Sequence, residues 1–141
     1  MLRDAIESPG ERSPEQLRRA YDELLAETVR RVGTTAVAER SGVEEERLDA
    51  LLAGESPSLT LTEAAAILAA DETRPDADAI AAEARDILLM GMSIAVLDVE
   101  ALASGIDDRM EPKEIQAKVE GRHPMDLDEY ALLHGYIEGR K

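Results

Sequence analysis

Basic side chains gather in one stretch of a chain that is otherwise strongly acidic. The 141 residues include 31 acidic and 16 basic ones, which gives a formal net charge of −15. Between residues 109 and 123 the sign of the charge balance reverses, because this stretch contains four basic residues and three glutamates. Five side chains here carry donors that phosphate oxygens and base edges accept: Arg109, Lys113, Gln116, Arg122 and His123. The alternative is a solvated helix in which Lys113 and Lys118 pair with nearby glutamates.

A second group of charged residues has mostly the opposite sign. It contains four carboxylates, Glu44, Glu45, Glu46 and Asp49, at the start of an expected helix, with Arg40 and Arg47 beside them. Carboxylates in that place complement the helix dipole, but they repel a phosphate backbone. The two arginines complete the candidate DNA-binding set. The carboxylates are instead candidates for docking a basic protein partner.

Residue types and spacings for enzyme chemistry are missing. The chain has no cysteine, and His123 and His134 lie without an acid or cysteine at ligand spacing, so we expect no metal site. No glycine-rich phosphate loop occurs, and no serine has a histidine placed to activate it. We therefore expect a protein that is not an enzyme and that uses no cofactor.

Apolar periodicity predicts an all-α fold. The residues Ser13-Pro14-Glu15-Gln16 form a capping-box start for a helix that reaches about residue 32. Further helices are expected over about 35–40, 44–53, 62–70 and 77–97. No segment alternates apolar and polar residues over a strand's length, so we expect no sheet.

The longest expected helix is apolar nearly all round in its second half. The run Ile87–Leu97 has no charged residue, yet it is shorter than the roughly 20 apolar residues that span a bilayer. A helix that is apolar on every side is buried on every side or shared between partners. Gly91 and Ala95 have the spacing of close helix packing, so they serve either the core or a homodimer seam.

An internal repeat accounts for this helix, because residues 97–137 align with the segment before it. Ser104-Gly105-Ile106 aligns with Ser41-Gly42-Val43, and Gly121 aligns with Gly54. The second copy is longer in its turn, with about four extra residues near 107–110. We therefore expect the long helix to lie buried between two similar units.

The segment Ala36–Ala70 has the pattern of short helices about a tight glycine turn. It resembles the Cro/phage-repressor-like helix-turn-helix family over residues 32–70, with a degenerate second copy over 97–137. The resemblance implies an all-α helix-turn-helix bundle over 13–90 after an N-terminal arm (1–12). A degenerate helix-turn-helix-like unit over 91–141 follows and shares the long central helix. In that family the second helix of the motif reads DNA in the major groove.

The amino-acid composition indicates the environment in which the protein works. The chain has three lysines and no Phe or Trp, and it resembles the cytoplasmic proteins of salt-loving archaea and an uncharacterised family of small acidic haloarchaeal proteins. The alternative is an ordinary acidic protein. We expect a cytoplasmic, non-enzymatic DNA-binding protein or transcriptional regulator. The competing interpretation is an acidic protein-protein interaction module, with a protein partner or a second copy and without DNA or membrane binding.

Overall fold

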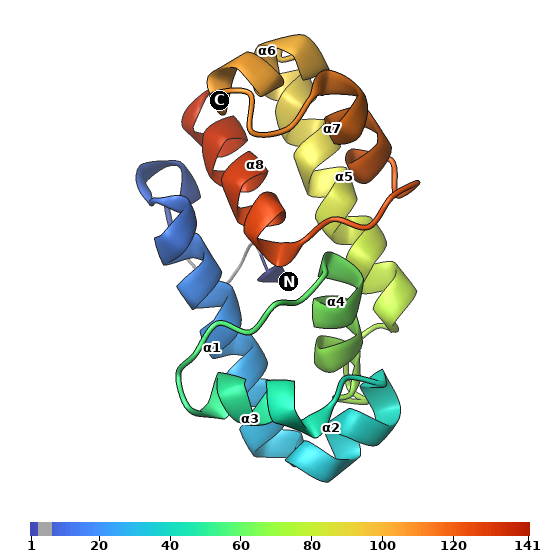
Figure 1. Cartoon of the computed structure of the whole chain (residues 1–141). Coiled ribbons are helices and arrows are strands. Elements are labelled where there is room, and N and C mark those ends of the chain that lie inside the picture. The colour runs from blue at the N-terminus through green and yellow to red at the C-terminus, as the bar shows by residue number, and fades with distance from the viewer. Residues whose placement is uncertain (3–6) are drawn as a thin grey trace.

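The computed structural model describes residues 1–2 and 7–141, and within them the fold is all-α (Figure 1). A short 3₁₀ helix, η2 (Pro9–Glu11), precedes the main helices. These are α1 (Pro14–Val32), α2 (Thr34–Ser41), α3 (Glu45–Leu52), α4 (Leu61–Ala69), α5 (Ala77–Ala95), α6 (Val99–Gly105), α7 (Pro112–Val119) and α8 (Leu127–Gly139). The helices expected from the sequence are present within one or two residues. Part of the expected N-terminal arm, residues 3–6, lies outside the described residues.

Local signals set the limits of α1. The Ser13 hydroxyl accepts from the Gln16 backbone N–H at 3.1 Å, and the Gln16 side chain accepts from the Ser13 N–H at 2.9 Å. Gly33 ends the helix at a φ of 101°, a value that favours glycine. Between these limits a fully buried stripe, Leu17, Tyr21, Leu25 and Val29, recurs every four residues and faces the core.

The eight α-helices form two sets of four in the same order. Their lengths are 19, 8, 8 and 9 residues in α1–α4, and 19, 7, 8 and 13 in α5–α8. Gly54 and Gly121 follow the third helix of each set with φ values of 80° and 79°. The fourth helices both begin with a capping box, at Thr60 and Asp126. The repeat therefore includes α1 and α5, and the long helix opens the second set.

Helices of the two sets pack on each other across the core. In Figure 1, α1 runs beside α8 and α5 runs beside α4, so the first helix of each set packs on the last helix of the other. The starts of α4 and α8 also pair reciprocally. The Leu61 N–H donates to the Met125 carbonyl at 2.7 Å, and the Leu127 N–H donates to the Leu59 carbonyl at 2.9 Å. This reciprocity gives the sets an approximate two-fold relationship.

The prediction that residues 87–97 are buried on all sides is wrong. Leu88, Gly91 and Met92 face the core, but four large apolar side chains lie on the opposite side of α5 or at its end. Their exposed fractions are Leu89 38%, Met90 62%, Ile94 61% and Val96 88%. The reason is tertiary: α4 and α8 cover one face of α5, and no other described helix covers the far face of its second half.

The alignment of Gly105 with Gly42 does not hold in the structure, because the two glycines have different places in their turns. Gly42 ends α2 with a left-handed φ of 75°, whereas Gly105 is the last residue of α6, and Asp107 and Asp108 supply the left-handed residues of that turn. A glycine is required at position 105 for a different reason. A Cβ atom there would lie 2.0 Å from Cζ of Tyr136, so the absent side chain makes room for that ring.

Candidate functional sites

The basic candidates near α7 lie on the surface, but they do not form a continuous positive ridge. Arg109, Lys113 and His123 are exposed, and no ion pair to them occurs among the described residues. Gln116 donates to Glu120, and Arg122 donates from Nε to the same carboxylate at 2.9 Å. The positive charge is thus interrupted in the middle of the stretch.

Lys118 is the clearest interruption. Its Nζ lies 2.6 Å from Glu114 and 2.5 Å from Glu129, and the side chain is only 13% exposed. Burial on its own lowers the pKa of Lys118, but hydrogen bonds to the two carboxylates outweigh that effect and raise it. Glu114 is one helical turn before Lys118, so the sequence spacing already favours this pair. Lys118 therefore acts as a clamp between α7 and α8.

Arg40 and Arg47 lie in the first set of helices and fasten it together. Arg40 donates to the Ala70 carbonyl at 2.8 Å and pairs with Glu72 at 3.2 Å. Arg47 donates to Glu63 at 2.6 Å, and this hydrogen bond lowers the pKa of Glu63. Both arginines tie the α2–α3 pair to α4 or to the segment after it, and neither joins the basic residues of α7.

The four carboxylate candidates are exposed around the start of α3. Glu44, Glu45, Glu46 and Asp49 all lie on the surface. Thr35 donates to Glu45 at 3.2 Å, and Glu44 approaches Arg47 at 3.9 Å. The surface of α3 is therefore negative. A phosphate backbone would be repelled from it.

Gly91 and Ala95 have different surroundings from each other. A Cβ atom on Gly91 would lie 2.6 Å from Cγ2 of the buried Ile137, so Gly91 belongs to the packing of α5 on α8. Ala95 is half-buried. The large apolar side chains exposed on this part of α5 and at its C-cap are Leu89, Met90, Ile94 and Val96, which we call the α5 apolar face. Val96 has a left-handed φ of 55°, which is rare and strained for a β-branched residue.

Sequence reasoning missed a buried charge cluster between α1, α8 and the connection before α4. Arg18, whose side chain is 6% exposed, donates to Asp22 at 2.9 Å and to Asp128 at 2.8 Å. It also donates to the Pro57 carbonyl, while the Ser56 hydroxyl donates to Asp22. The four-residue spacing of Arg18 and Asp22 was the available signal. Its burial depends on distant segments, which the local sequence does not show.

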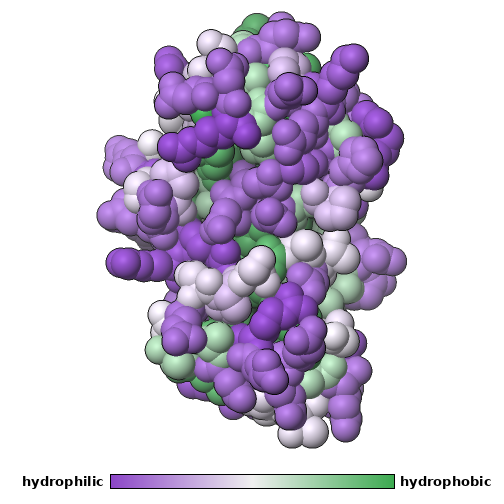
Figure 2. Space-filling model, viewed as in Figure 1, coloured by the Kyte–Doolittle hydropathy of each residue, from purple (hydrophilic) through white to green (hydrophobic). Residues whose placement is uncertain are grey.

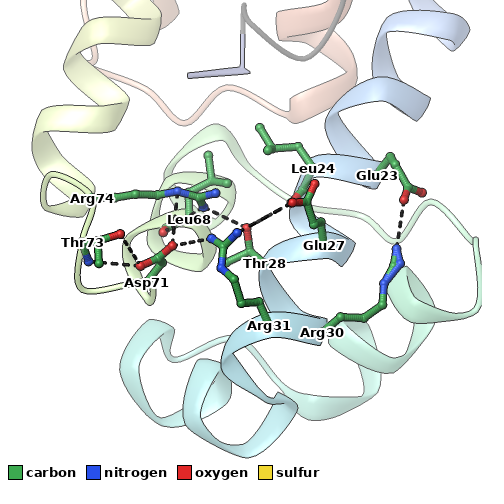
Figure 3. A network of polar contacts seen from close by, with 10 residues as sticks. All are labelled: Glu23, Leu24, Glu27, Thr28, Arg30, Arg31, Leu68, Asp71, Thr73 and Arg74. Atoms are coloured by element: carbon green, nitrogen blue, oxygen red, sulfur yellow. Dashed lines mark hydrogen bonds and ion pairs between the residues drawn. The ribbon is translucent and has the colours of Figure 1, made fainter.

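Two further polar clusters hold helices in place. Figure 3 shows Asp71 receiving hydrogen bonds from Thr73 and Arg31, which joins the end of α1 to the α4–α5 connection. In the core, the Tyr21 hydroxyl lies 2.7 Å from Nδ1 of His134, and burial raises the pKa of Tyr21. These contacts join α1 to α8 and are structural.

The described part of the chain offers neither a metal centre nor a single membrane-spanning helix. Among residues 1–2 and 7–141, no group of three or more His, Cys, Asp or Glu side chains could hold a metal ion. No single helix in that same part of the chain is long and apolar enough to cross a membrane. The face seen in Figure 2 is mostly hydrophilic, with small and separate apolar areas.

Comparison with known proteins gives one relationship. No curated protein matches the chain, and no solved structure matches it. One family model matches residues 17–140, a range that contains α2 to α8 completely and all of α1 except its first three residues. The chain therefore belongs to DUF5791, a family of unknown function.

Proposed function

We propose that the protein is a non-enzymatic helical interaction module that pairs with a second copy of itself through the α5 apolar face. The observation that carries the proposal is the exposure of Leu89, Met90 and Ile94 on α5 and of Val96 at its C-cap. Isolated exposed apolar residues are ordinary, but a cluster on one surface is typical of an interaction site.

The lack of charge on this face is compatible with a second copy as the occupant. The chain has a net charge of −15, so two copies repel each other over most of their surfaces. The stretch 87–97 contains no charged residue, and a two-fold contact there places apolar side chains against the same side chains of the other copy. Salt at about 1 M would further screen the remaining repulsion to a length of about 3 Å.

The size of the face supports a modest affinity. The exposed fractions of its four side chains together equal about two and a half fully exposed side chains. At about 1.5–3 kcal/mol for each fully buried side chain, two copies would gain on the order of 10 kcal/mol. Association costs about 4–15 kcal/mol, so with a cost near the lower end we expect a dimer with a Kd of tens to hundreds of micromolar.

Sedimentation velocity over a concentration series in about 2 M KCl tests the proposal, since this salt screens surface repulsion. The wild-type chain should form a dimer as concentration rises, and the double variant Met90→Gln, Ile94→Gln should remain a monomer. Leu52→Gln is the matched control, because Leu52 is 39% exposed on α3 and lies outside the face. A wild-type monomer up to about 500 µM would contradict the proposal.

DNA binding remains a second candidate function, favoured by one specific observation. Arg109 and Lys113 flank the start of α7 with exposed side chains that have no ion pair among the described residues. The resemblance to the Cro/phage-repressor-like family supports the same idea. Salt reduces the affinity gained from phosphate contacts, so DNA binding in concentrated salt would depend on base contacts.

Fluorescence anisotropy with genomic duplex fragments separates the two candidates. If DNA is bound, Lys113→Glu should weaken binding at both low and high KCl concentration. Arg19→Glu makes the same change of charge at an exposed residue of α1 and should have a much smaller effect. An equal loss from both variants would indicate a general charge effect, and no binding at all would end the DNA candidate.

A further inference from the structure

A cavity of about 340 Å³ lies between the start of α4, the middle of α5 and the α7–α8 connection. Its polar lining is basic or neutral, and it includes no carboxylate. In a chain with nearly twice as many acidic as basic residues, such a lining is unusual. The side chains and backbone that line it come from Thr60, Leu61, Thr62, Arg85, Lys118, Gly121, Arg122, His123, Pro124 and Met125.

The approximate two-fold relationship supplies an internal comparison. The N-caps of α1 and α5 are Ser13 and Asp76, and the buried residues after them keep the same spacing, as Leu17 and Ile80 show. In this register Arg18 corresponds to residue 81, an alanine. The residues around the Arg18 guanidinium, Asp22, Pro57 and Asp128, have counterparts that line the cavity. These counterparts are Arg85, Pro124 and Thr62, so the cavity lies where that guanidinium lies in the other half.

The charges around these two places are opposite. Asp22 on α1 corresponds to Arg85 on α5, and both line their site from the first helix of a set. Asp128, the second residue of α8, corresponds to Thr62 of α4. After the paired glycines at 54 and 121, Ser56 corresponds to His123. One site holds an internal cation among carboxylates, whereas the other is an open cavity among basic side chains.

We propose that this cavity binds the phosphate group of a small molecule, which takes the place that the Arg18 side chain fills in the other half. The planar guanidinium group of arginine can donate two parallel hydrogen bonds to phosphate oxygens. The Thr62 hydroxyl and the His123 ring can donate further hydrogen bonds. A volume of about 340 Å³ is within the usual range of about 300–1,000 Å³ for small-molecule sites.

Arg85 is the central residue of this site. It is half-buried, and no ion pair to it occurs among the described residues. Lys118, in contrast, is held by Glu114 and Glu129, and Arg122 shares its charge with Glu120. An anion entering the cavity would therefore find the Arg85 charge uncompensated by the protein.

Gly121 allows Arg85 to lie where it does. A Cβ atom on Gly121 would be 2.9 Å from Nε of Arg85, so the side chain crosses directly over this turn. Gly121 also has a φ of 79°, which other residues adopt at a cost. The turn at residue 121 thus brings the guanidinium against the backbone at the edge of the cavity.

Titration calorimetry with inorganic phosphate at fixed ionic strength, balanced with KCl, tests the proposal. The wild-type chain should bind phosphate with a stoichiometry of one, and Arg85→Gln should weaken the affinity on the order of tenfold or more. Arg19→Gln removes an exposed arginine of α1 that is outside the cavity, and it should leave the affinity unchanged.

Ala81→Glu gives a second test. It places a carboxylate of the protein itself at the position that corresponds to Arg18, four residues before Arg85. This variant should lose phosphate binding and should unfold at a temperature no lower than that of the wild type without phosphate. If the variant does not fold, Arg85→Gln alone decides the question.

Three results would overturn the inference. They are no phosphate binding by the wild type, equal weakening by Arg85→Gln and Arg19→Gln, and undiminished binding by a folded Ala81→Glu variant. In the first of these cases, the wild type could still bind duplex DNA and Arg85→Gln could lose that binding. That result would assign the arginine to a nucleic-acid backbone instead of a small molecule.

Discussion

Replacing Arg18 with alanine should destabilise the protein more than any exposed charge substitution. The guanidinium is 6% exposed and donates to two carboxylates and one carbonyl, so it joins α1 to α8 and to the connection before α4. Removing it leaves the Asp22 carboxylate, which is 11% exposed, without its cation. Breaking a buried ion pair on one side costs about 3–5 kcal/mol.

The magnitude comes mainly from Asp22. Asp128 is 76% exposed, so its pair with Arg18 is screened by water and contributes less than about 1 kcal/mol. In a chain of this size a loss of about 4 kcal/mol corresponds to a fall of about 12 °C in melting temperature. Thermal unfolding followed by circular dichroism in concentrated KCl would measure it.

Two further variants separate a buried pair from a general packing effect. Arg19→Ala, at the exposed neighbouring residue, should change stability by less than about 0.5 kcal/mol. The double variant Arg18→Met, Asp22→Leu should recover most of the loss, because it leaves no buried charge unpaired. A loss below about 1 kcal/mol in Arg18→Ala, or an equal loss in the double variant, would refute the reasoning.

Three other predictions concern single contacts. Tyr21→Phe removes the hydroxyl 2.7 Å from His134 in the core, and it should cost about 1–3 kcal/mol in chemical denaturation; no loss would contradict a structural role for that contact. Hydrogen bonds from Thr73, aided by a nearby arginine, lower the pKa of Asp71 to about 2, so its stabilisation is present above the ordinary pKa and is lost as the pH falls toward 2. The stability difference between wild type and Asp71→Asn should therefore stay constant from about pH 6 to about pH 5 and shrink as the pH falls from about 4 toward 2, and a constant difference over the whole range would argue against this origin. Gly91→Ala should destabilise by about 1 kcal/mol or more in thermal unfolding, because overpacking against the α8 isoleucine exceeds the gain in helix propensity; a net gain would contradict the close approach.

The helices themselves were predictable because their signals are local. Capping residues such as Ser13 and Thr60 mark helix starts, glycines such as Gly33 and Gly54 mark ends, and the apolar spacing between them has a helical period. The repeat was also detectable, since its glycine and proline signals recur along the chain. The full extent of the repeat was not detectable. The helices α1 and α5 bury residues at corresponding positions, but their sequences have little in common.

The candidate sites were less predictable because their character depends on pairing between distant residues. Arg109, Lys113 and Lys118 look alike in the sequence, yet only Lys118 is held between carboxylates, and one of these is on another helix. Likewise, the composition of 87–97 predicts burial, while its exposure depends on how many helices pack around it.

The sequence by itself determined an all-α chain of two similar halves with a strongly negative surface, since charge, caps and period are properties of neighbouring residues. Only the tertiary structure decided which helices of the two sets pack on each other, which face of α5 stays uncovered, and that Arg18 fills one site while the corresponding site is an open cavity. The physical reason is that burial and charge compensation depend on residues brought together from distant parts of the chain.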